Sequence, residues 1–365
     1  MDGLPVSTVV AALAFVGGTV MGVTARSMHF CTLGAIADAF IGHKHKGLRA
    51  WALAIATATL ATQAMHMAGL IDLQDSIYLT PDFGWLGAIL GGLCFGFGMA
   101  LVGTCGYGTL VRLGGGDLRS LVDVFVLGFF AYMTLRGLSG VGRVLFIEPT
   151  NADLSALGGQ GLIEAAAWLL DADGEALRGT FVALVVIALL AYCFKDRTFR
   201  HSRKDVAGGI IIGLVVASGW FITGVVGADD FDPTPLGSYS FVTPVGESLV
   251  YLMTFSGATI NFGVGAVGGV IFGAFLASRA KAEFRLEAFD DPKEMLRHVF
   301  GAALMGFGGV TALGCTVGQG ITAMSTLSMS APLALASIFL GAYLGLRYLI
   351  EGSLLGALKS GFARY

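Results

Sequence analysis

Charged side chains are scarce in this chain: Asp, Glu, Lys and Arg make up 13% of its 365 residues, whereas a soluble domain carries about 25%. Hydrophobic residues make up 55%. This balance excludes a soluble globular protein and predicts an all-α polytopic membrane protein. A membrane-spanning helix needs about 20 apolar residues, and uncharged runs reach that length at residues 3–25, 50–70, 84–111, 206–227, 248–278 and 299–346.

The chain also lacks the sequence signals of several functional classes. It has five cysteines but no Cys-x-x-Cys pair, and no histidine pair or carboxylate stands beside them, so nothing indicates a metal site or a disulfide relay. The absence of a Gly-x-x-x-x-Gly-Lys-Ser/Thr motif argues against ATP-driven pumping by this chain. No basic patch or nucleic-acid motif is present either. We therefore expect no cofactor, no metal and no nucleic-acid partner.

Basic loops orient the predicted spans. Residues 43–49 and 195–204 are rich in Lys, Arg and His, so the positive-inside rule places both loops in the cytoplasm. Threading the apolar runs between these loops gives about nine spans, with the N-terminus outside and the C-terminus in the cytoplasm. Four of the spans contain glycine-rich or polar interruptions, which predict re-entrant-like loops near the membrane centre.

Two of these interruptions share one pattern. Gly-Phe-Gly begins nine residues before Cys105 and, 210 residues later, nine residues before Cys315. In each copy another glycine, Gly108 or Gly318, follows the cysteine by three residues. Glycine on both sides of the thiol predicts a backbone bend rather than a continuous helix.

The recurrence of this pattern predicts an internal repeat with halves at residues 1–200 and 201–365, within a single integral membrane domain. The segments that carry Cys105 and Cys315 cross the membrane in opposite directions in the predicted topology. Opposite crossing is what an inverted repeat requires. The sequence therefore favours an inverted repeat.

A second, looser pair of breaks completes the four interrupted spans. In the first half, Arg26 and His29 precede Cys31 inside an apolar segment, where a charged group is costly unless it faces a cavity. In the second half, the break at 256–263 ends at Gly263. The predicted crossing directions of these two loops are the same rather than opposite, so their relative orientation stays open.

Helices that end inside a membrane have a specific chemistry. Their unpaired backbone N–H groups carry partial positive charge, and several such ends directed at one point form an anion site. Buried thiols at these ends are expected to be neutral S–H groups, which donate weakly to the sulfur or oxygen atoms of an anion. We therefore expect a substrate pathway of Cys31, Cys105 and Cys315. The supporting loop residues are expected to be Gly106, Gly108, Gly263, Gly318 and Gln319.

Other candidate residues have simpler interpretations. Cys94 and Cys193 are interpreted as small hydrophobic side chains. Arg26 and Arg112 either steer an anion or extend to the membrane interface. Gln319 is either a polar group of the pathway or a partner in a hydrogen bond between helices.

Several motifs together resemble the YeeE/YedE family. They are Met-His-Phe-Cys at 28–31, Gly-Thr-Cys-Gly-Tyr-Gly-Thr-Leu-Val-Arg at 103–112, Phe-Asp-Asp-Pro-Lys-Glu-Met-Leu-Arg-His at 289–298, and Gly-Cys-Thr-Val-Gly-Gln-Gly at 314–320. Each motif is weak alone, and together they are specific. The resemblance extends over residues 17–347.

This resemblance implies a transporter of inorganic sulfur compounds in the bacterial inner membrane, with thiosulfate import as the expected activity. It implies nine spans in an hourglass shape, four central loops, and central cysteines that fall on Cys31, Cys105 and Cys315. It also implies a small cytoplasmic sulfur carrier similar to TusA as a partner. Because some relatives handle other sulfur or selenium species, the substrate is not fixed by the family.

One alternative belongs to a different functional class. The same cysteines could form persulfides or disulfides in a membrane thiol enzyme, such as a sulfurtransferase or an oxidoreductase. No general base or cofactor motif accompanies any cysteine, and this absence favours a transporter.

Overall fold

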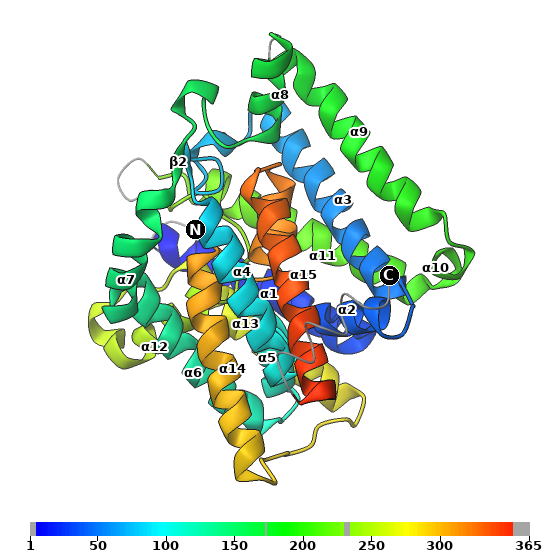
Figure 1. Ribbon diagram of the computed structural model, residues 1–365, viewed down its shortest axis with the longest axis vertical. Coiled ribbons are helices and arrows are strands. Elements are labelled where there is room, and N and C mark those ends of the chain that lie inside the picture. The colour runs from blue at the N-terminus through cyan, green and yellow to red at the C-terminus, as the bar shows by residue number, and fades with distance from the viewer. Residues whose placement is uncertain (1–4, 172–173, 230–233, 353–365) are drawn as a thin grey trace.

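The computed structural model describes residues 5–171, 174–229 and 234–352. Within these ranges the chain is almost entirely helical, and its only strands form a two-residue antiparallel pair, β1 (Asp82–Phe83) with β2 (Ala152–Asp153). The predicted all-α membrane fold is therefore confirmed. The helices, shown in Figure 1, are α1 (Val6–Met28), α2 (Thr32–Phe40), α3 (Lys46–Met67), α4 (Trp85–Val102), α5 (Gly106–Gly114), α6 (Leu118–Arg136), α7 (Leu138–Phe146), α8 (Leu162–Leu170), α9 (Gly174–Phe194), α10 (Arg197–His201), α11 (Arg203–Phe221), α12 (Thr243–Thr254), α13 (Phe262–Ala280), α14 (Pro292–Thr311) and α15 (Ser330–Glu351).

Seven helical segments in the described part of the chain are long and apolar enough to cross a membrane. Two of them are broken, because Val6–Phe40 comprises α1 and α2, and Trp85–Gly114 comprises α4 and α5. Helices α3 and α14 have comparable lengths of 22 and 20 residues but do not belong to the seven. The nine spans therefore remain a prediction.

Helices from the two predicted halves pack against each other rather than forming separate bundles. Helix α1 packs along α13, α3 along α11, and α4 along both α14 and α15; Figure 1 shows α4, α14 and α15 side by side. Glycine permits this close packing: a Cβ at Gly273 of α13 would lie 2.1 Å from the Thr19 carbonyl oxygen of α1. Small residues allow helix backbones to approach closely in a membrane, which accounts for many of the 55 glycines.

The two helices that lead to the duplicated cysteines run in opposite directions. Gly91 in the first half of α4 lies against Gly308 near the end of α14, and Gly98 farther along α4 lies against Gly301 in the middle of α14. This antiparallel contact is the arrangement expected of an inverted repeat. The repeat itself remains a prediction.

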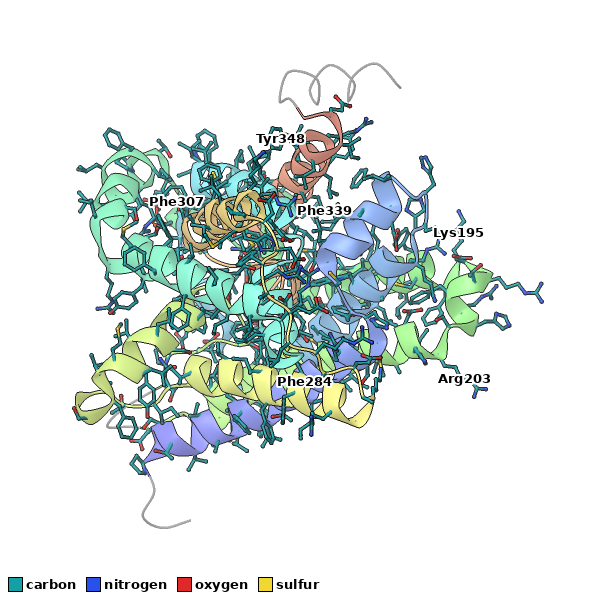
Figure 2. The ribbon with its side chains drawn as sticks, turned by 90° about the horizontal axis from the view of Figure 1, so that it is seen from below. Lys195, Arg203, Phe284, Phe307, Phe339 and Tyr348 are labelled. Atoms are coloured by element: carbon teal, nitrogen blue, oxygen red, sulfur yellow. The ribbon has the colours of Figure 1, made fainter. Side chains whose placement is uncertain are left out.

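The basic loop 195–204 forms α10 and its flanking turns, at an edge of the molecule. Lys195 and Arg203 are exposed there, and Figure 2 shows both side chains extending away from the helices. The N-terminal residues 1–4 and the C-terminal residues 353–365, on which the predicted orientation of the two ends depends, lie outside the described residues.

Candidate functional site

Each of the three candidate cysteines accepts a backbone hydrogen bond with its sulfur atom near the start of a helical segment, and Cys31 and Cys105 are the N-cap residues of α2 and α5. The Cys31 sulfur accepts a hydrogen bond from the Gly34 N–H at 3.5 Å, and that of Cys105 accepts one from the Gly108 N–H at 3.4 Å. The Cys315 sulfur accepts one from the Gly318 N–H at 3.5 Å, at the start of a π-helical turn, η6 (Gly318–Ala323). The side chain of an N-cap residue accepts from the third helical N–H.

The backbone before each cysteine follows a shared course as well. The residue two positions before it lies in the left-handed region: His29 has φ 55°, Gly103 has φ 80° and Leu313 has φ 57°. A left-handed residue commonly ends a helix, and here it ends the first half of each broken span or follows it closely. The three bends are therefore one local structure used three times: a left-handed residue, one linking residue, a cysteine, and a glycine N–H three positions later.

The three bends meet at threonine side chains. Thr32, directly after Cys31, points its hydroxyl group toward the Cys105 sulfur at 3.8 Å and donates to the Thr316 hydroxyl at 3.2 Å. Thr316 directly follows Cys315. Both threonines, Cys105 and Cys315 are fully buried, while Cys31 is half-buried. The predicted convergence of the three cysteine bends is therefore present in the fold.

Sequence reasoning missed these threonines, although a signal was available. Cys-Thr occurs at both Cys31 and Cys315, and the order is reversed as Thr104-Cys105 in the remaining bend. A hydroxyl group beside each thiol adds a stronger hydrogen-bond donor than S–H. The repeated pair therefore identifies polar groups of the same site.

A buried stretch before α12 also enters this centre, and the sequence did not predict it. Tyr239, Phe241 and Val242 are fully buried although residues 237–242 are not helical. The Phe241 ring lies 5.0 Å from the Tyr107 ring of α5, and a Cβ at Gly318 would lie 2.7 Å from the Ser240 hydroxyl oxygen. This stretch therefore contacts two of the three bends.

The structure places Gly263 differently from the cysteine bends. Its neighbours are Pro244 and Asn261, and the turn 255–257 before it is exposed. The predicted break at 256–263 is present, since α12 ends at Thr254 and α13 begins at Phe262. In the second half, however, it is the stretch 237–242 that reaches the cysteine bends.

The remaining predicted residues surround the bends. A Cβ at Gly106 would contact Leu127 and Val242, and a Cβ at Gly108 would lie 2.0 Å from the Thr104 hydroxyl oxygen. Gln319 is fully buried and donates from its Nε2 atom to the Ala312 carbonyl oxygen at 2.6 Å. Its Oε1 atom has no hydrogen-bond partner among the described residues.

The two arginines and the two other cysteines have partners of their own. Arg112 donates to the carbonyl oxygen of Gly103 at 2.8 Å and so holds the bend before Cys105, while Arg26 pairs with Glu283 at 3.5 Å. The Cys193 thiol donates to the Arg49 carbonyl oxygen at 3.3 Å. Cys94 is half-buried on α4.

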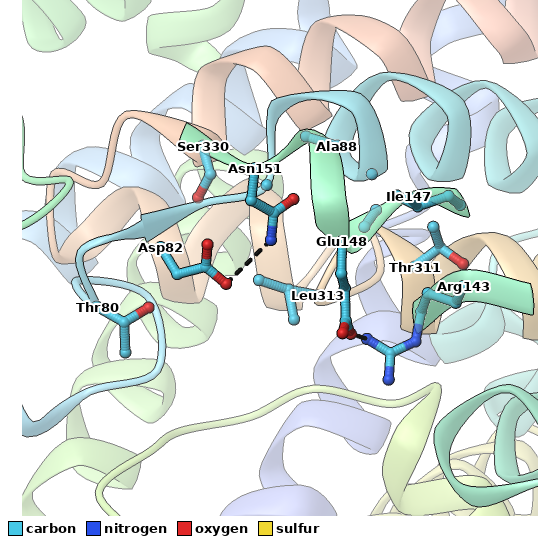
Figure 3. A pocket seen from close by; sticks show the side chains of 13 residues that line it. Thr80, Asp82, Ala88, Arg143, Ile147, Glu148, Asn151, Thr311, Leu313 and Ser330 are labelled. Carbon is cyan, nitrogen blue, oxygen red and sulfur yellow. Dashed lines mark hydrogen bonds and ion pairs between the residues drawn. The ribbon is translucent and has the colours of Figure 1, made fainter. Parts of the chain in front are cut away.

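A cavity adjoins the bend at each end of this arrangement. One, of about 170 Å³, is lined by Leu313 and Thr311 beside the Cys315 bend and by the ion pair of Arg143 with Glu148 at 2.5 Å (Figure 3). We call it the Leu313 cavity. The other, the Cys31 cavity, has a volume of about 390 Å³ and is lined by Cys31 itself, His29, Trp51, Lys46 and Lys204.

The sulfur atoms of the three cysteines act as hydrogen-bond acceptors. Their polar contacts among the described residues are with backbone N–H groups and the Thr32 hydroxyl, with no carboxylate or imidazole among them. No group of three metal-ligating side chains occurs in the described ranges. The arrangement suits a ligand that accepts weak hydrogen bonds, such as a soft anion.

Comparison with known proteins agrees with this geometry. A family model described as sulphur transport matches residues 27–344. The thiosulfate transporter TsuA of Escherichia coli (strain K12) is 26% identical over 339 residues, which cover 89% of this chain and 91% of that protein. The thiosulfate transporter TsuA of Spirochaeta thermophila is 29% identical over 264 residues, which cover 70% and 75%. The chain belongs to the sulphur transport family, also called YeeE/YedE.

Proposed function

We propose that this protein imports thiosulfate into the cytoplasm along a central pathway formed by Cys31, Cys105 and Cys315. The observation that carries the proposal is the threefold use of one bend, in which a thiol caps a half-helix and the three caps converge at Thr32. The names of the two relatives as thiosulfate transporters support the choice of substrate.

The bends supply attraction without a fixed charge. Half-helix N-termini carry partial positive charge that draws in an anion. Neutral S–H groups then donate to its sulfur and oxygen atoms, where thiolates would repel it. The hydroxyl groups of Thr32 and Thr316 add polar contacts at the buried centre. Such weak donors hold an anion loosely enough to pass it on.

The glycines give the substrate access to the thiols. Gly106 directly follows Cys105, and Gly108 and Gly318 lie at the capping positions, where a Cβ would come within 2.0 Å of the Thr104 hydroxyl oxygen and 2.7 Å of the Ser240 hydroxyl oxygen. We leave Gly263 out of the pathway because its neighbours are Pro244 and Asn261.

Thiosulfate is proposed to enter from the Leu313 cavity and to leave through the Cys31 cavity. The latter is lined by Lys46 and Lys204 and also by Asp38 and Asp205, and Lys46 pairs with Asp205 at 2.6 Å. We place the protein in the bacterial inner membrane with the Leu313 cavity facing the periplasm, the N-terminus periplasmic and the C-terminus cytoplasmic. A TusA-like carrier on the cytoplasmic side is the proposed recipient of the imported sulfur.

The proposed repeat explains how the chain builds the pathway. Residues 1–200 supply the bends at Cys31 and Cys105, and residues 201–365 supply the bend at Cys315 and the stretch 237–242. Because helices α4 and α14 are antiparallel, their bends approach the centre from opposite ends. Both halves contribute to one membrane domain.

Uptake of radiolabelled thiosulfate tests the proposal directly. Cells that lack other sulfate and thiosulfate permeases should accumulate label when they express this protein and should not do so with an empty vector. Equal label in both cultures, with the protein present in the membrane, would contradict the proposed function.

Import of thiosulfate requires an energy source when the cell interior is negative. A single charge costs about 2.3 kcal/mol per 100 mV of membrane potential, so a dianion costs about 4.6 kcal/mol. A coupled cation would offset part of this cost.

A further inference from the structure

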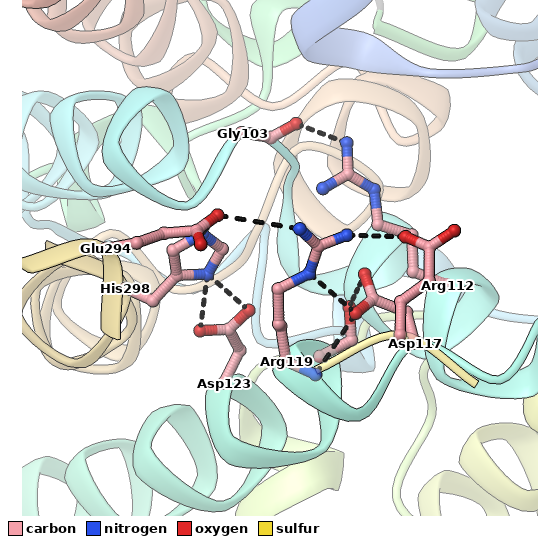
Figure 4. Close-up of polar contacts among 9 residues, drawn as sticks. Gly103, Arg112, Asp117, Arg119, Asp123, Glu294 and His298 are labelled. Carbon is pink, nitrogen blue, oxygen red and sulfur yellow. Dashed lines mark hydrogen bonds and ion pairs between the residues drawn. The ribbon is translucent and has the colours of Figure 1, made fainter. Parts of the chain in front are cut away.

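A histidine and an aspartate form a buried pair between α6 and α14 that the thiosulfate pathway does not use. His298 Nδ1 lies 3.0 and 3.1 Å from the two carboxylate oxygens of Asp123. The two residues are 5% and 1% exposed. Figure 4 shows the pair at one side of a polar cluster in which Arg119 lies between Glu294 and Asp117. Ionisable groups buried in a membrane protein are costly, and they commonly mark ion pathways or proton relays.

Charged groups face the pair from each neighbouring element. On α14, Glu294 Oε1 lies 3.9 Å from His298 Nε2 and 3.5 Å from Arg119 Nη1. On α6, Arg119 also contacts Asp117 at 3.0 Å. From α5, Arg112 lies within electrostatic range of Asp123.

Two more groups complete these surroundings. The ring of Phe289 meets the His298 ring edge-on at 5.2 Å between centroids, and Glu287 contacts Arg119 at 2.7 Å. Glu294 thus lies between the His298 imidazole and Arg119, an arginine that is always charged.

The pair is mechanically connected to two cysteine bends. Leu127 lies one helical turn beyond Asp123 on the same face of α6, and its side chain would meet a Cβ at Gly106, next to Cys105, at 3.4 Å. Helix α14, which carries His298, ends at Thr311, four residues before Cys315. A change in the contact between α6 and α14 therefore reaches both bends.

We propose that the His298–Asp123 pair binds the proton that accompanies thiosulfate, so that the protein is a proton symporter. This inference rests on the proposed function. In the unloaded state, the neutral imidazole donates from Nδ1–H to the Asp123 carboxylate, and Nε2 is deprotonated. A proton that crosses the membrane together with thiosulfate binds to Nε2. It is then released to the cytoplasm, because His298 lies near the start of α14, at the end opposite the Leu313 cavity. One proton per thiosulfate lowers the translocated charge from −2 to −1.

Glu294 gives proton binding a structural consequence. Once Nε2 carries a proton, His298 becomes a charged donor that competes with Arg119 for the Glu294 carboxylate. Since Arg119 is held by Asp117 at the N-terminus of α6, a shift of Glu294 changes how α14 is anchored to α6. Loading of the proton thereby changes the positions of the helices that carry Cys105 and Cys315.

Transport by purified protein in liposomes tests this inference. The membrane potential is clamped at zero with potassium and valinomycin, and a gradient of one pH unit, acid outside, is imposed. One coupled proton gives about tenfold accumulation of labelled thiosulfate, because one pH unit is a tenfold difference in proton activity. Exchange of internal for external thiosulfate without a gradient is measured on the same vesicles.

His298→Gln and Asp123→Asn keep hydrogen-bonding groups of similar size and remove the titrating site. We expect both variants to lose the tenfold response to the gradient and to retain exchange within about twofold of the wild type. Glu283→Gln is the matched control, because Glu283 is a more exposed carboxylate paired with Arg26. It should retain both activities.

The outcomes separate the two proposals. If the wild type exchanges thiosulfate but ignores the pH gradient, symport is wrong and thiosulfate transport stands. If His298→Gln keeps the full response to the gradient, the pair is not the proton site. Loss of exchange together with the gradient response in both variants assigns the pair a structural role and also overturns the inference. Wild-type protein that shows no exchange contradicts the proposed function itself.

Discussion

The Cys315 bend and the turn before α13 both bind a free backbone N–H group with a side chain, but the two side chains differ. In both, a side chain just before a helical segment accepts from the N–H three residues on: the Cys315 sulfur from Gly318 at 3.5 Å, and the Asn261 Oδ1 from Val264 at 2.9 Å. The asparagine is exposed and its amide donates to Glu247, whereas the cysteine is fully buried.

This difference shows that capping alone does not explain the cysteines. Asparagine is among the best N-cap residues and cysteine is not. Where a cap lies at the surface the chain uses asparagine or aspartate, as at Asn261 and Asp291, and where the three bends converge it uses cysteine each time. The need to bind a passing substrate therefore explains the cysteines better than helix capping does.

Removal of a thiol is the strongest test of the difference between the buried cysteines and the exposed Asn261. We expect Cys105→Ala and Cys315→Ala each to reduce thiosulfate uptake at least ~20-fold, equivalent to about 1.8 kcal/mol in the transport barrier, because a donor is lost at a buried position. Membrane levels measured by immunoblot should be unchanged. Uptake near the wild-type rate in Cys105→Ala would mean that the substrate does not depend on this thiol.

Cys105→Ser sharpens the comparison, since serine caps helices better than cysteine. We expect uptake to fall by about tenfold even so. The hydroxyl group is smaller and less polarisable than the thiol, and it binds more firmly to the oxygen atoms of sulfate. The measurement is uptake of labelled thiosulfate with excess sulfate as competitor. Full activity in Cys105→Ser would mean that capping, and not the thiol, is what the position requires.

Asn261→Ala applies the equivalent change to the exposed cap. Loss of an N-cap costs about 0.5–2 kcal/mol of stability, and the exposed position favours the lower end. We expect thermal unfolding in detergent to shift by only a few degrees, with uptake within about twofold of the wild type. An uptake defect as deep as that of Cys315→Ala would place this turn in the pathway.

The smallest effects are expected at the two cysteines outside the bends. Cys94→Ala and Cys193→Ala should leave uptake within about 1.5-fold of the wild type, because neither thiol caps a broken helix. Cys193 donates to the Arg49 carbonyl oxygen, so a modest loss of thermal stability is expected for that variant alone. A strong uptake defect in either variant would show that cysteines outside the bends are also required for thiosulfate uptake.

The sequence predicted the bends well because glycine and cysteine spacing is local. The repeated interval to Gly108 and Gly318 corresponds to the capping hydrogen bond of each thiol. The left-handed residues were only partly foreseeable: Gly103 suits this conformation, but nothing in the sequence distinguishes His29 and Leu313 as residues that adopt it.

The sequence did not predict which non-helical segments are buried. The break at 256–263 was predicted correctly as a break, yet it is mostly exposed, while Tyr239, Phe241 and Val242 are buried. The latter stretch carries no glycine-bracketed thiol, and its place is set by contacts with α1, α5 and α14 rather than by its own pattern. Tertiary packing of this kind leaves no periodic signal.

The central claim is that intact thiosulfate passes between neutral thiols, and one measurement tests it most directly. Purified protein in liposomes is supplied with thiosulfate labelled at its outer sulfur, and the protein and both solutions are analysed during turnover. We expect the label inside the vesicles as thiosulfate, with no change in the mass of the protein. Persulfide chemistry would transfer the outer sulfur to a thiol and release sulfite. A gain of about 32 Da on Cys105 together with sulfite outside would contradict the account.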